Sequence, residues 1–202
     1  HMAEGIKALQ AGQKRRNDKL LQRSRYLGQQ VRSEVLPLTV DIGRQRSLSR
    51  EEVAALEGLQ IDAAGIAIRS LASLAKINEL DHLGGGLELI PSLLLTLAVS
   101  DYEHIEYTIE HAHTSIGYYA ALAALGFVDE QTVVEGFRRG LDIPGHVSWL
   151  PGGTPLNGGR LGVMIPVAVG QALGKRASFG KGSWVVCHCG DAGYISGQGL
   201  NG

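Results

Sequence analysis

Two short strand-like segments, separated by helical patterns, constrain the fold of this chain more than any other feature. The segment 105–110 alternates apolar and polar residues with period two, which predicts a strand. The segment 184–187, Trp-Val-Val-Cys, is continuously apolar, as is typical of a buried parallel strand. Strands that alternate with helices predict an α/β fold, with an open, mostly parallel sheet and helices on both faces.

Local signals predict where the helices lie. Ser49 and Glu52 form a capping-box pattern, which opens a long and well-buried helix whose apolar residues run from Val53 to Ile77. A second apolar helix follows with Pro91 in its first turn, where proline is tolerated. Capping residues and apolar spacing place these further helices at 87–99, 115–126 (capped by Thr114 or Ser115), 129–139 (capped by Asp129) and 165–173.

The charge is uneven along the chain, although the net charge is only −1. The first thirty residues carry seven Lys or Arg and two acidic residues, and the span 3–34 is predicted to be a polar, basic helix. Such a segment can bind nucleic acid or a membrane, but without interleaved aromatic residues it favours a solvated or partner-packing helix. We therefore divide the chain into a basic helical extension and connector, 1–48, and a domain, 49–202.

Composition narrows the class of protein. No apolar run reaches the roughly 18 residues needed to span a bilayer, and no signal peptide is visible. Cys187 and Cys189 do not make a disulfide framework, so a cytoplasmic protein is expected. From the charge and the apolar runs, we expect it to bind neither nucleic acid nor membrane.

Candidate functional residues gather where the two predicted strands end. Ligands of open α/β sheets bind beyond the carboxyl ends of the strands. One strand leads into His111-Ala112-His113, and the other into Cys189-Gly190-Asp191. A carboxylate at this location can bind a metal that neutralises a phosphate, and the glycines let backbone N–H groups approach anionic oxygens, although a Gly-Asp pair at a strand end is most often a turn.

Metal binding by the histidines and cysteines themselves has weaker support. His111 and His113 point the same way on a strand, but no third ligand completes a zinc set. In Cys187-His188-Cys189 the two thiols share one face of a strand and the imidazole takes the other. Small buried side chains in a core strand are the favoured interpretation.

The order of these motifs resembles the N-terminal half of transketolases and of the single-chain first component of pyruvate dehydrogenase. The resemblance runs from about residue 50 to the end of the chain and depends on order and spacing. Its motifs are the loop 80–84 with His82, the strand end 110–113 with His113, Ile143-Pro144-Gly145-His146, the turn 158–164 and the opening Gly190-Asp191-Ala192 of a metal motif.

This resemblance implies a thiamine diphosphate-binding fold and assigns the site. By it, His82, His113 and His146 line the catalytic pocket around the reacting carbons. The cofactor-binding residues implied are His113, Gly159, Leu161, Gly190, Asp191 and Ala192, with Asp191 as the Mg²⁺ (or Ca²⁺) ligand. Two positions depart from the family pattern: Ala192 replaces a glycine, and Ser196 stands where the family has a glutamate.

The family's closing metal ligand and its pyrimidine-binding domain do not occur in the 202 residues. The expectation is therefore a domain truncated at its C-terminus, which works in a hetero-oligomer with a second subunit that carries the pyrimidine-binding domain. The implied activity is transketolase-like transfer of a two-carbon ketol unit, with a ketose phosphate or a 2-oxo acid as the small-molecule partner. Two alternatives stay open: a 2-oxo-acid decarboxylating component that passes an acyl group to a lipoyl or acyl carrier domain, and a non-catalytic scaffold subunit.

Overall fold

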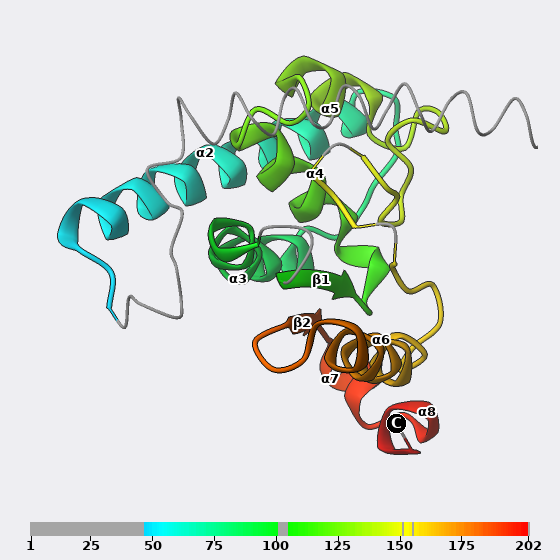
Figure 1. Cartoon of the computed structure of the whole chain (residues 1–202). Helices are drawn as coiled ribbons and strands as arrows, with labels where there is room; N and C mark the ends of the chain where they lie inside the picture. Colours follow the sequence, from blue (N-terminus) through cyan, green and yellow to red (C-terminus); the bar gives the residue numbers. More distant parts are fainter. Residues whose placement is uncertain (1–46, 101–104, 151, 155, 202) are drawn as a thin grey trace, which may run out of the picture.

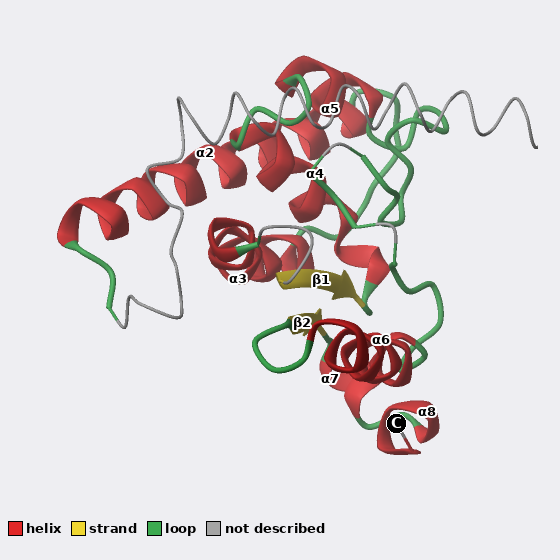
Figure 2. Cartoon of the chain, in the orientation of Figure 1, coloured by secondary structure: helices red, strands yellow, loops and turns green. Residues whose placement is uncertain are grey.

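The computed structural model describes residues 47–100, 105–150, 152–154 and 156–201, so the predicted helix 3–34 lies outside the described residues. Within these ranges helices surround a two-stranded parallel sheet, formed by β1 (Ile105–Ile109) and β2 (Trp184–His188) (Figures 1 and 2). Ile105 pairs with Trp184 at one end and Ile109 with His188 at the other. The α/β class and the parallel pairing are confirmed, with a sheet of two strands in the described part of the chain.

Helices cover both faces of this sheet. Helix α3 (Gly84–Val99) contacts the face of β2 that bears His188, and α6 (Met164–Phe179) lies on the opposite side (Figure 1). The Cys187 thiol points toward the Met164 carbonyl of α6, because successive side chains of a strand face opposite sides. The neighbouring side chains of Cys187 and His188 therefore face two different helix layers, as the strand geometry predicts.

Helix α2 (Arg50–Ala75) begins at the predicted capping box. The Glu52 amide donates to Ser49 Oγ at 3.2 Å, and the Ser49 amide donates to the Glu52 carboxylate at 2.7 Å. One face of α2 is buried against α3 and α4 (Ser115–Ala124), through Ala63, Ile66, Ala67, Ser70 and Leu74. The helix is buried over this stripe alone, since Val53 and Ile77, predicted core positions, are exposed.

Helices α3 and α4 approach each other at two glycines. A Cβ at Gly117 would lie within 3.0 Å of the backbone of Gly86, so only glycine permits this contact. The close approach places the start of α3, which follows the His82 loop, against the start of α4, which follows His113. Two segments predicted to carry catalytic histidines are thereby brought together.

Several helix boundaries differ from their predictions. Helix α3 starts at Gly84, so Pro91 lies inside the helix and not in its first turn, where it removes the N–H that would donate to the Leu87 carbonyl. Helix α5 (Glu130–Gly136) is capped by Asp129 as predicted, through a 2.9 Å bond from the Thr132 amide, but it ends before residue 139. Helix α6 extends beyond the predicted 165–173, and α4 ends two residues before the predicted Gly126.

The predicted caps of α4 have other partners. Thr114 closes a short 3₁₀ turn, η1 (Ala112–Thr114), by donating its hydroxyl to the His111 carbonyl at 2.9 Å. Ser115 donates to the Gly145 carbonyl at 2.8 Å. These side chains therefore tie the strand end and a distant loop to α4, and neither caps the helix.

The second strand is less buried than its apolar sequence predicts. Trp184 is 57% exposed, and the next three residues of β2 are half-buried. The reason is that β2 has one strand neighbour, β1, in the described part of the chain. Two short helices, α7 (Asp191–Tyr194) and α8 (Gly197–Asn201), follow β2, and none of the helices in the described ranges is both long and apolar enough to cross a membrane.

Candidate functional site

A cleft of about 420 Å³ lies at the carboxyl ends of both strands. Its walls come from the first half of α3, the end of β1, the turn around Leu161 and the end of β2. The lining residues are Gly85, Glu88, Leu89, Ser92, His111, His113, Thr114, Leu161, His188, Cys189, Gly190, Asp191, Ala192 and Gly193. Five residues predicted from the sequence, His113, Leu161, Gly190, Asp191 and Ala192, therefore line one cavity.

A buried carboxylate that the sequence did not single out organises the base of this cleft. Glu110, directly after β1, is 1% exposed. Its carboxylate accepts a hydrogen bond from the Gly162 amide and a longer one, 3.4 Å, from the Gly190 amide. Glu110 thus joins the end of β1 to the turn beside Leu161 and to the end of β2. The alternation of residues 105–110 predicted only a strand residue at this position.

Histidine rings from two loops lie close together beside the cleft, which His111 and His113 line. The His113 ring lies 5.9 Å from the His111 ring, and the His82 ring lies 5.7 Å from the His113 ring, measured between centroids. Burial and the neighbouring His113 lower the pKa of His111, while Glu110 raises it in part. The Nδ1 atom of His111 is buried and has no hydrogen-bond partner within the described ranges. A neutral His111 therefore presents an unsatisfied polar atom beside the cleft.

His146 lies on a loop that is attached to α4 by its backbone. The Tyr119 hydroxyl donates to the His146 carbonyl at 2.8 Å and accepts from the Ser148 amide at 3.0 Å. The side chain of His146 is exposed, and no ring contact among the described residues joins it to His82 or His113. The structure therefore brings the predicted histidines 82 and 113 together and holds the third on the adjacent loop.

His188 closes the cleft between β2 and α3. Its Nδ1 lies 3.3 Å from Ser92 Oγ and its Nε2 lies 3.1 Å from Thr96 Oγ1, while its ring packs edge-on against Tyr107. Burial, with a smaller effect of His111, lowers the pKa of His188 to about 4. At neutral pH this imidazole is therefore uncharged and serves to hold strand and helix together.

The two cysteine thiols are adjacent on one face of the strand end, as predicted from their spacing. Their Sγ atoms lie 3.3 Å apart, and both residues are half-buried, less buried than expected. Burial, followed by the Cys187 thiol and Glu110, raises the pKa of Cys189 to about 12. Cys189 is therefore a protonated thiol at neutral pH, unlike the thiolate of a nucleophilic cysteine.

The predicted metal ligand is exposed at the start of α7. Asp191 Oδ1 accepts from the Ala192 amide at 2.8 Å, so one carboxylate oxygen is engaged within the turn. No group of three or more His, Cys, Asp or Glu side chains close enough to share a metal ion occurs in the described part of the chain. Gly159 does not line the cleft, although Leu161 does. Asp191, the predicted metal ligand, lines the cleft together with Gly190 and Ala192.

Comparison with protein-family models, with curated proteins and with solved structures found no match to this chain.

Proposed function

We propose that this chain is the diphosphate-binding half of a thiamine diphosphate-dependent, transketolase-like transferase that acts with a second subunit. The observation that supports the proposal is the shared cleft. His113, Leu161 and the 190–192 turn lie far apart in sequence, yet all line one cavity beyond the ends of two parallel strands. This is where α/β folds bind ligands. The finer fold assignment, an open thiamine diphosphate-binding sheet, is part of the same proposal.

The size and charge of the cleft fit a diphosphate accompanied by a cation. Its volume, about 420 Å³, falls within the usual range of small-molecule sites. Two carboxylates, Glu88 and Asp191, line it, so an anionic group is favoured there only when a cation accompanies it. Mg²⁺ is commonly held by one or two carboxylates together with phosphate oxygens and water. Asp191 would supply the protein's carboxylate ligand.

A histidine of the cleft wall also fits a ligand. His111 lines the cleft, where an imidazole nitrogen can donate to or accept from a ligand. The bound cofactor would supply a carbon nucleophile for cleaving the bond next to the carbonyl of a ketose phosphate.

The chain's own residues would bind and orient the substrate and exchange hydrogen bonds with it. His113 would donate a hydrogen bond to a substrate oxygen, and the neighbouring His82 would accept one from a substrate hydroxyl. Glu110 would keep the turns at Gly162 and Gly190 in place through its two backbone hydrogen bonds, so that the cleft is preorganised.

Calorimetric titration tests this proposal. The wild-type chain, with the partner subunit present, is titrated with thiamine diphosphate and Mg²⁺ and compared with Asp191→Ala. We expect the variant to bind at least about tenfold more weakly, because it loses the protein's metal ligand. Asp62→Ala, an exposed aspartate on α2, is the matched control and should bind as the wild type does. Equal binding by Asp191→Ala and wild type would refute the proposal.

A non-catalytic scaffold is the second candidate. It is favoured by the sparse donor set, since Asp191 is the one predicted metal ligand and its Oδ1 already accepts from the Ala192 amide. A scaffold would assemble with the partner subunit and show no heat of cofactor binding in the same titration.

A further inference from the structure

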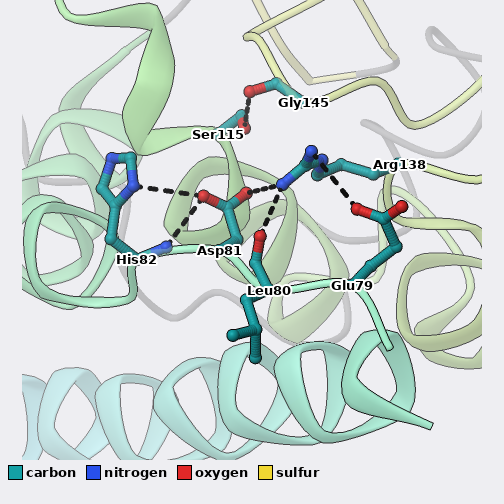
Figure 3. Close-up of polar contacts among 7 residues, drawn as sticks. All are labelled: Glu79, Leu80, Asp81, His82, Ser115, Arg138 and Gly145. Carbon is teal, nitrogen blue, oxygen red and sulfur yellow. Dashed lines mark hydrogen bonds and ion pairs between the residues drawn. The ribbon is translucent and has the colours of Figure 1, made fainter. Parts of the chain in front are cut away.

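One arginine holds the segment that carries His82 (Figure 3). Arg138 Nη1 donates to the Leu80 carbonyl at 2.9 Å and lies 3.4 Å from Asp81 Oδ2. Its Nη2 lies 3.9 Å from the Glu79 carboxylate. The guanidinium therefore meets three consecutive residues, 79–81, and its planar fork suits such a multiple contact better than a lysine would.

The carboxylate of Asp81 passes this constraint on to His82. Asp81 Oδ1 accepts from the His82 amide at 2.8 Å and lies 3.3 Å from His82 Nδ1. The Asp81 side chain is 13% exposed, whereas the His82 side chain is 69% exposed. The Asp81 carboxylate is mostly buried, and the guanidinium orients one of its oxygens. The other oxygen accepts from the His82 backbone amide and lies within ion-pair distance of one nitrogen of the accessible imidazole.

Arg138 is itself fixed to the loop that carries His146. Its backbone has the left-handed φ of 58°, and its amide donates to the Ile143 carbonyl at 2.8 Å. A Cβ at Gly145 would lie 3.2 Å from Arg138 Cγ, so the arginine stem packs against this glycine. The Gly145 carbonyl in turn accepts from Ser115 on α4, the helix that follows His113 (Figure 3). The network therefore connects all three histidine-bearing segments.

We propose that Arg138 is a positioning residue which, through Asp81, holds His82 beside His113 with the proton on Nδ1. The tautomer of a neutral histidine is set by the hydrogen bond that one ring nitrogen makes, and a carboxylate accepts only from a protonated nitrogen. Nε2 of His82 is then left as a lone-pair acceptor. The use of that acceptor in catalysis rests on the proposed function, whereas the positioning itself does not.

The test is spectroscopic and uses the full chain without any cofactor. Long-range ¹H–¹⁵N correlation spectra at pH 8.5, where an imidazole is neutral, report which ring nitrogen of His82 carries the proton. We expect the Nδ1–H form to predominate in the wild type. We expect Asp81→Asn and Arg138→Ala to shift the population at least about fivefold toward Nε2–H, because each weakens the carboxylate contact.

A control variant and a second measurement complete the test. Arg139→Ala removes the neighbouring arginine, which bonds to Ser73 on α2, and should leave the His82 tautomer unchanged. Amide hydrogen exchange of His82 should accelerate at least about fivefold in Arg138→Ala, since the Asp81 carboxylate that accepts from this amide is no longer held. Asp81→Asn replaces a side chain on a loop, so it provides a readout even where Arg138→Ala folds poorly.

The results separate this inference from the proposed function. An unchanged tautomer in both Asp81→Asn and Arg138→Ala, or an equal shift in Arg139→Ala, would overturn the positioning role. Failure of the Asp191→Ala titration to show weaker binding would overturn the cofactor site and leave the spectra of His82 unaffected.

Discussion

Replacing Gly193 by alanine tests the arrangement of the buried Glu110 carboxylate. Gly193 lies in α7, and a Cβ at this position would lie within 3.0 Å of both carboxylate oxygens of Glu110. The backbone of Gly193 does not require a positive φ. Steric conflict with the carboxylate is therefore the reason for glycine here.

The expected loss of stability follows from three effects. Replacing glycine by alanine within a helix would stabilise it by about 1 kcal/mol. Overpacking a filled site costs about 1–3 kcal/mol, and displacing the carboxylate from the Gly162 and Gly190 amides costs about 1.5–3 kcal/mol. We therefore expect Gly193→Ala to lower the free energy of unfolding by about 1.5–5 kcal/mol.

Urea denaturation followed by circular dichroism measures this change, within a double-mutant cycle. In the Glu110→Ala background the added methyl has room, so Gly193→Ala should change stability by less than about 1 kcal/mol. Gly174→Ala is the matched control, because a Cβ at this helical glycine of α6 would meet nothing within 4 Å. The control should be neutral or stabilising by about 0.5–1 kcal/mol. An equal cost of Gly193→Ala in both backgrounds would refute the reasoning.

Three further predictions concern buried groups that join the elements around the cleft. Because the pKa of His188 falls to about 4 on folding, the folded state binds fewer protons than the unfolded state between about pH 4 and 6.5. The contribution of His188 to the free energy of unfolding should be complete above pH 6.5 and fall by about 3 kcal/mol toward pH 4. The urea midpoints at pH 7.5 and 4.5 should therefore differ more in the wild type than in His188→Gln. Tyr119→Phe leaves a carbonyl and an amide of the 146–148 loop without their partner. It should lower the free energy of unfolding by about 1–3 kcal/mol and speed amide exchange in this loop. Unchanged exchange would contradict the role of the hydroxyl. Gly117→Ala places a methyl against the backbone of Gly86, which cannot rotate away, so thermal denaturation should show a loss of at least about 3 kcal/mol, and wild-type stability would contradict the close approach of α3 and α4.

Local patterns predicted much of the fold because they depend on neighbouring residues. The capping box at Ser49, the Asp129 cap and the two strands were found from sequence, since hydrogen bonds over three residues and a period of two are local. The predicted convergence of His113 with the Gly190-Asp191 turn also followed from a general rule, that parallel strands end at one edge of a sheet.

Predictions failed where a distant partner decides the outcome. Thr114 and Ser115 have the right chemistry for caps, but the carbonyls of His111 and Gly145 take their hydroxyls. The sequence predicts Pro91 in a first turn because glycines 84–86 are typical of a loop, whereas the helix starts at Gly84 and Gly86 packs against Gly117.

By itself, then, the sequence determined that two parallel strands end in histidine- and glycine-bearing turns. Only the tertiary structure decided how these turns are held. Glu110 is a strand residue by its pattern, but it becomes the buried acceptor for two amides contributed by residues 52 and 80 positions later. Arg138 is an ordinary charged residue at a helix end until the chain brings Asp81 beside it. Such charges act through partners far away in sequence, and no local periodicity encodes that proximity.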